Sequence, residues 1–124
     1  MNIVDSSAWL AYFSDEPNAE HFAPVVEETS NLLVPSICLY EVFRVILRES
    51  GEDDAFQAVA AMLQGTVLDL DAGSSLEAAA IGLTEGLAVA DSIIYMATLK
   101  HDATLWTQDK HFEGKPKVEY RPKR

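Results

Sequence analysis

The chain has 124 residues, of which 48% are hydrophobic and 23% are charged, and its formal net charge at pH 7 is −11. This hydrophobic content is sufficient for a core and argues against disorder, and the length suits one domain, expected to span residues 1–124. No apolar stretch has the length needed to cross a bilayer and no signal peptide is evident, so the sequence predicts a soluble, cytoplasmic protein.

In chain order, the hydrophobic pattern predicts short strands that alternate with helices. The predicted elements are strand 2–5, helix 6–13, helix 18–28, strand 32–35, helix 37–49, helix 52–64, strand 66–71, helix 74–85, helix 89–101, strand 103–107 and a possible edge strand at 117–120. Ser6 or Ser7 is a suitable cap for the first helix and Ser36 for the third, while Pro24 is expected to kink or restart the second. Gly51 is expected to end the third helix.

Helices between successive strands predict an α/β protein, a three-layer α/β/α sandwich with a central, mostly parallel sheet. In such sheets, ligands bind beyond the carboxyl ends of the strands. Asp5 and Asp109 lie at the carboxyl ends of predicted strands. Glu41 lies about a turn and a half into the helix after the second strand, and Asp91 lies in the first turn of its helix. The four carboxylates can therefore point at one edge of the sheet.

Asp5, Glu41 and Asp91 are each the only charge in an otherwise apolar stretch. A carboxylate in apolar surroundings loses hydration, which is costly unless a partner or a cation compensates. Each acid also has an ordinary explanation. Asp5 could cap a helix, Glu41 could pair with Arg44, Asp91 could complement a helix dipole, and Asp109 could open a loop.

The joint interpretation of the four acids is a metal site. Clustered carboxylates repel one another unless a cation is present, and a hard divalent ion such as Mg²⁺ with oxygen ligands can promote displacement at phosphorus by water. Ser6 and Thr107 would supply supporting hydroxyl groups. Zinc is not expected, because His21, His101 and His111 are isolated in the sequence and there is no cysteine pair.

The negative charge is unevenly distributed. Residues 110–124 carry a balance of +4, so the rest of the chain carries −15. This basic C-terminal segment is either a solvated terminus or a small patch that contacts phosphate beside an acidic site. Cys38 lies in an apolar run and is the only cysteine, so we expect it to be a core residue in a reducing compartment.

Four sequence blocks resemble the PIN-domain ribonucleases, and in particular the VapC-type toxins of prokaryotic toxin–antitoxin pairs. The blocks are VDSSAWL at 4–10, VPS at 34–36 followed by Glu41, ADSIIYMA at 90–97 and LWTQDKHF at 105–112. Together they cover essentially the whole chain in the order and approximate spacing of the family.

The resemblance implies an α/β/α fold and a metal-dependent endoribonuclease. It assigns Asp5, Glu41, Asp91 and Asp109 as the acidic quartet that is both catalytic and metal-binding, with Mg²⁺ or Mn²⁺ as cofactor. The family cleaves single-stranded or looped RNA, and transfer RNA and ribosomal RNA are recurrent targets of its toxins.

The resemblance also implies partners: a homodimer and a cognate antitoxin, whose basic segment would suit the acidic surface. Arg44 and Lys110 are candidate contacts to RNA phosphates. The alternative function is a catalytically silent PIN fold that serves as an RNA- or protein-binding scaffold. A receiver or phosphatase built on Asp5 is less consistent with the sequence, because Ser6 and Ser7 follow where those proteins need further acids.

Overall fold

Five short strands form one parallel sheet in the order β3-β2-β1-β4-β5. In this computed structural model, which describes residues 1–124, the strands are β1 (Asn2–Val4), β2 (Leu32–Pro35), β3 (Thr66–Leu68), β4 (Thr104–Thr107) and β5 (Val118–Tyr120). Ile3, Val4 and Leu105 have no exposed surface, because strands in the middle of the sheet are covered on both faces. The predicted α/β class is confirmed, and every strand pair is parallel.

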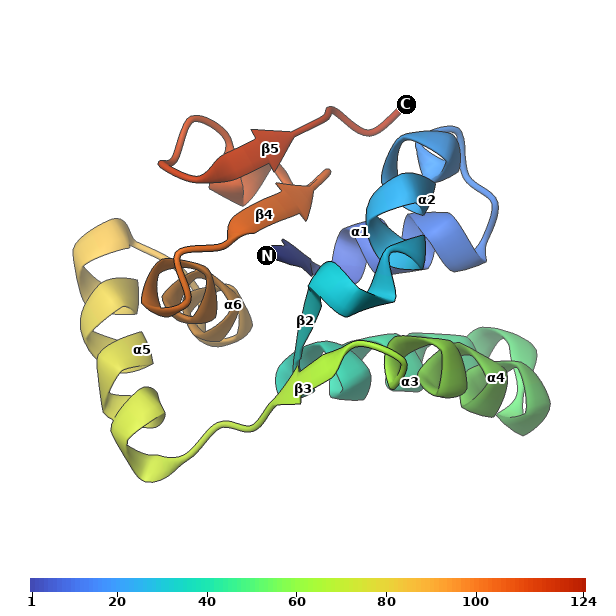
Figure 1. Cartoon of the computed structure of the whole chain (residues 1–124), viewed down its shortest axis with the longest axis horizontal. Helices are drawn as coiled ribbons and strands as arrows, with labels where there is room; N and C mark the ends of the chain where they lie inside the picture. Colours follow the sequence, from blue (N-terminus) through green and yellow to red (C-terminus); the bar gives the residue numbers. More distant parts are fainter.

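Six helices cover the sheet. They are α1 (Ser6–Phe13), α2 (Ala19–Glu27), α3 (Ser36–Ser50), α4 (Glu52–Met62), α5 (Ala72–Glu85) and α6 (Val89–Lys100), with short 3₁₀ turns η1 (Thr29–Asn31) and η2 (Lys110–Phe112). Figure 1 shows α1 to α4 on one side of the sheet and α5 and α6 on the other. Right-handed crossovers explain this division. The chain moves across the sheet in one direction from β1 to β2 to β3, and in the opposite direction from β3 to β4, so the helices of these connections lie on opposite faces. The predicted three-layer sandwich is therefore confirmed.

The core joins the inner faces of the helices to both faces of the sheet. Its largest fully buried side chains include Trp9 of α1, Phe22 of α2 and Tyr95 of α6. Cys38 also has no exposed surface, and its Sγ lies 3.8 Å from the carbonyl oxygen of Val4. Burial raises the pKa of the Cys38 thiol, so this side chain behaves as a small apolar residue, as predicted.

Three predicted element boundaries are wrong, and helix capping explains the two around α5. The strand predicted at 66–71 ends at Leu68, and the helix predicted to begin at 74 begins at Ala72, because the Asp71 carboxylate accepts a hydrogen bond of 2.8 Å from the backbone N–H of Ser74. Ser36 is the first residue of α3 rather than its cap, and Pro35 precedes the helix without a capping hydrogen bond. The helix α2 runs through Pro24.

No single helix is long and apolar enough to cross a membrane. Only α5 and α6 taken together, with a bend of 106° between them, have the length and apolar composition of a span.

Candidate metal centre

The strand order reverses between β1 and β4, and this is where the candidate site lies. From β1 the chain moves to β2, on one side, whereas from β4 it moves to β5, on the other. A crevice forms at the carboxyl ends of such a pair of strands. Val4 is in register with Trp106, and the Asp5 N–H donates to the Trp106 carbonyl at 3.1 Å. This pairing puts Asp5 directly beside Thr107, which is distant in sequence.

Asp5 is buried, with 2% of its surface exposed, and it accepts three kinds of hydrogen bond. It caps α1 by accepting from the Ala8 N–H at 3.1 Å, and it accepts from the hydroxyls of Ser7 at 2.8 Å and Thr107 at 2.9 Å. Burial raises the pKa of Asp5 from 3.8 to about 7, the hydrogen bonds partly oppose this, and the charge of Asp109 adds to it. Asp5, and not the predicted Ser6 or Ser7, is therefore the cap of α1, but capping leaves a costly buried charge unexplained.

Thr107 links Asp5 to Asp109. Its hydroxyl donates to Asp5 and accepts from the backbone N–H of Asp109 at 2.8 Å. Asp109 in turn caps η2 by accepting from the backbone N–H of His111 at 2.9 Å. One buried hydroxyl thus fixes the relative positions of two carboxylates that come from neighbouring strands.

Glu41 joins the same network from α3. The Ser6 hydroxyl donates to Glu41 Oε1 at 2.7 Å, and Ser6 is next to Asp5 in the chain. Arg44 forms no ion pair with Glu41, because its guanidinium donates instead to the Tyr40 hydroxyl at 3.1 Å. The helix-pair explanation of Glu41 is therefore wrong.

Asp91 lies in the first turn of α6, with 17% of its side chain exposed. Burial and the charge of Asp109 raise its pKa, while hydrogen bonding to His111 lowers it. Oxygens of Asp91 and Asp109 and a ring nitrogen of His111 all lie within 4.8 Å of one another. These three side chains are close enough to share one ion, whereas Asp5 and Glu41 lie outside this group.

The donor set fits a hard divalent cation. The hydroxyls of Ser6 and Thr107 link Glu41, Asp5 and Asp109, and His111 links Asp109 to Asp91. None of these four carboxylates, which come from four segments of the chain, is paired with a lysine or an arginine. Only the imidazole of His111 approaches them. Oxygen-rich sites of this type suit Mg²⁺ and Mn²⁺.

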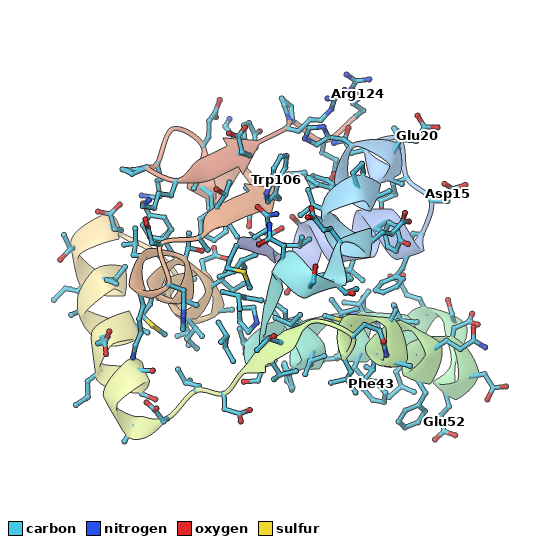
Figure 2. The ribbon with its side chains drawn as sticks, in the orientation of Figure 1. Asp15, Glu20, Phe43, Glu52, Trp106 and Arg124 are labelled. Atoms are coloured by element: carbon cyan, nitrogen blue, oxygen red, sulfur yellow. The ribbon has the colours of Figure 1, made fainter.

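The candidate phosphate contacts lie on the surface around this site. Arg44 and Lys110 are both exposed, and neither forms an ion pair within the chain. Part of the basic C-terminal segment is held against α2 instead. Arg121 Nη1 lies 3.2 Å from His21 Nδ1, and Asn18 donates to the Pro122 carbonyl at 2.9 Å. Figure 2 shows the chain end near Glu20 of the same helix.

Sequence reasoning missed His111, which it treated as isolated. The structure places its Nδ1 3.2 Å from Asp91 Oδ2 and 3.4 Å from Asp109 Oδ1. The contact of His111 with Asp109 could have been predicted from the local sequence Asp109-Lys110-His111. An aspartate often accepts a hydrogen bond from the backbone N–H two residues later, and this turn brings the two residues together. The second partner, Asp91, is 20 residues away and no local pattern indicates it.

Comparisons with known proteins give a consistent result. The family model described as PIN domain matches residues 3–118. No curated protein sequence has significant similarity to the chain. Among solved structures, the fold is similar to the sarcin–ricin loop cleaving toxin VapC20 from Mycobacterium tuberculosis (TM-score 0.82, 18% identity, covering 98% of this chain and 100% of that one).

Two further solved structures have the same fold. One is a toxin–antitoxin complex from Klebsiella pneumoniae (TM-score 0.80, 19% identity, covering 96% of each chain). The other is DNA-bound VapBC from Salmonella typhimurium (TM-score 0.71, 17% identity, covering 98% of this chain and 96% of that one).

Proposed function

We propose that this chain, which belongs to the PIN domain family, is a metal-dependent endoribonuclease that acts as the toxin of a toxin–antitoxin pair. The observation that carries the proposal is the convergence of four carboxylates without a neutralising lysine or arginine, one of them almost fully buried. Such an arrangement is costly for a structural role alone and is suited to holding cations.

The quartet Asp5, Glu41, Asp91 and Asp109 would hold Mg²⁺ or Mn²⁺ in this proposal. A bound divalent ion would activate water and offset the charge that develops on phosphate oxygens. The chain itself supplies orientation: Thr107 holds Asp5 and Asp109 at a fixed spacing. Ser6 fixes one oxygen of Glu41, which leaves the other free to act as a ligand.

The proposed reaction is hydrolysis of an RNA phosphodiester. A water oxygen forms a bond to phosphorus while the bond from phosphorus to the ribose 3′ oxygen breaks, which leaves a 5′ phosphate and a 3′ hydroxyl. Arg44 and Lys110 are free to contact neighbouring phosphates, because neither is committed to an acid of the chain. Transfer RNA and ribosomal RNA are the proposed substrates, and the similar toxin VapC20 is described as cleaving the sarcin–ricin loop.

A cognate antitoxin is the proposed protein partner. One similar structure is a toxin–antitoxin complex and another is VapBC, which supports this assignment. The net charge of −11 would favour an antitoxin segment that is rich in lysine and arginine.

A second copy of the chain is the other proposed partner, and the face of α5 is where we place it. Leu83, which is 88% exposed, and Val89, which is 78% exposed, line a largely apolar hollow of about 520 Å³ between α5 and α6. Leu76, also on α5, is 75% exposed. Exposed apolar surface of this extent marks an interaction site. The hollow has no charged residue in its lining, so two acidic copies can meet there without placing like charges in contact.

The test is cleavage of total transfer and ribosomal RNA by the purified protein and by Asp5→Asn, in Mg²⁺, Mn²⁺ or EDTA, with the new 5′ ends mapped. We expect site-specific cuts that carry 5′ phosphates, need a divalent ion and disappear in the variant. A well-folded protein, freed of any co-purified antitoxin, that binds Mn²⁺ but cuts none of these RNAs would favour the scaffold alternative.

A further inference from the structure

We propose that His111 is a metal ligand together with Asp91 and Asp109, and that its nitrogen makes this part of the site prefer Mn²⁺ to Mg²⁺. The inference deepens the proposed function, since it rests on the presence of a metal site and adds a residue outside the acidic quartet.

The first argument is the spacing of the three donor atoms. In an octahedron with metal–ligand distances of about 2.1 Å, as for Mg²⁺, adjacent ligands are about 3.0 Å apart, and for the longer bonds of Ca²⁺ they are roughly 3.3–3.7 Å apart. The His111 Nδ1 lies 3.2 Å from Asp91 Oδ2 and 3.4 Å from Asp109 Oδ1. These separations suit adjacent positions around an ion of intermediate size, and Mn²⁺ is such an ion.

The second argument is that the chain fixes the backbone at His111 on both sides, so that its imidazole starts beside the two acids. On one side, the backbone N–H of His111 donates to Asp109, which fixes the residue to one of its two acidic neighbours. On the other side, Phe112 is fully buried and its ring lies 6.2 Å from that of Tyr95. Tyr95 is four residues after Asp91 on α6 and therefore lies on the same face of that helix.

Tyr95 is itself fixed, because its hydroxyl donates to the carbonyl of Pro116 at 3.0 Å. The contact between Phe112 and Tyr95 therefore clamps η2 against α6 and keeps His111 beside Asp91. The His111 side chain is 72% exposed, so hydrophobic packing does not explain its position and an ion can reach it from solvent.

The third argument is ligand chemistry. Mg²⁺ strongly prefers oxygen and usually keeps several waters, whereas imidazole is a good ligand for first-row transition metals. Exchange of one oxygen donor for an imidazole nitrogen therefore favours Mn²⁺ over Mg²⁺. A site made of carboxylates alone would lack this bias.

The experiment measures Mn²⁺ binding directly, without RNA. Electron spin-echo modulation of Mn²⁺ bound to the wild-type protein is expected to show coupling to a ¹⁴N nucleus, and this coupling should be absent in His111→Ala and His111→Gln. Calorimetric titration should show that the variants lose at least about tenfold in Mn²⁺ affinity, since even residues that only orient ligands contribute this much, with Mg²⁺ affinity changed less than about twofold. His101→Ala, at the exposed end of α6, is the matched control and should behave as wild type.

Two outcomes would overturn the inference: bound Mn²⁺ without ¹⁴N coupling in the wild type, or an equal loss of Mn²⁺ and Mg²⁺ affinity in the variants. The second would mean that His111 only positions Asp91 and Asp109. Failure of the proposed function looks different, because then the wild type binds neither ion or binds them without cutting RNA.

Discussion

Asp5→Asn should make the metal-free protein more stable at neutral pH while it removes a ligand of the proposed metal site. The pKa of Asp5 is raised from 3.8 to about 7 in the folded state. The folded protein therefore retains a proton that the unfolded chain releases above about pH 4, so stability falls as pH rises from about 4 to about 7. At 1.36 kcal/mol per pKa unit, the wild type loses up to about 4 kcal/mol relative to a variant that carries no charge at this position.

Asparagine can keep the geometry of the site. It caps helices as well as aspartate does, and its oxygen can accept from the Ala8 N–H. Its amide nitrogen can donate to the Thr107 hydroxyl, which has lone pairs for this bond and for the Asp109 N–H. The Thr107 O–H loses its carboxylate acceptor in this variant, at a cost of about 1–3 kcal/mol that does not depend on pH and that offsets only part of the gain.

The assay is urea unfolding in EDTA at about pH 5 and about pH 8, followed by repetition at about pH 8 with Mn²⁺. The stability gap between variant and wild type should widen with pH, and Mn²⁺ should stabilise only the wild type. Asp71→Asn is the matched control, because Asp71 also caps a helix but its pKa is lowered by its hydrogen bond to Ser74, so this variant should not gain stability at neutral pH. The same pH dependence in wild type and Asp5→Asn would refute the reasoning.

Three further predictions concern the hydroxyl link, the helix contact and the apolar face. Thr107→Val should reduce RNA cleavage at least tenfold and lower the free energy of unfolding by about 1–3 kcal/mol. Thr107→Ser keeps the hydroxyl and should behave as wild type in both measurements. A fully active Thr107→Val would argue against a role for the hydroxyl that links Asp5 and Asp109. Gly82→Ala would place a Cβ 2.2 Å from Ser92 Oγ and should cost about 1–3 kcal/mol in thermal or urea unfolding. Gly73→Ala on the same helix, with no neighbour closer than 3.7 Å, should instead be neutral or stabilise by up to about 1 kcal/mol. Leu83→Glu should halve the mass measured by light scattering, and an unchanged mass would place the self-association surface elsewhere.

The sequence was most informative where a residue follows a buried strand. Asp5 and Asp109 could be placed at one edge of the sheet because the chain direction of parallel strands is fixed by the helices between them. Glu41 and Asp91 could be placed near helix starts for a similar reason. The role of Thr107 was anticipated only as a nearby hydroxyl, since its hydrogen bonds depend on the register of β1 against β4.

What the sequence could not supply depends on contacts between distant segments and on local competition for hydrogen bonds. His111 contacts Asp91 because Phe112 packs on Tyr95, and no local sequence pattern predicts that these two aromatic residues are in contact. The helix α5 begins two residues earlier than predicted because the Asp71 carboxylate caps it. The alternation of apolar residues had instead predicted a strand as far as residue 71.

The pairing of β1 with β4 has a consequence for the order of events during synthesis. The hydrogen bond between Asp5 and Thr107 joins residues 102 positions apart, and both Thr107 and Asp109 belong to the last fifth of the chain. Contacts this far apart are slow to form, and domains complete their folding only when the whole unit is available. The nascent chain therefore lacks the proposed cation site until β4 and the residues up to Asp109 have been synthesised. A polypeptide cut short before β4 would leave the inner edge of β1 open to pair with other chains.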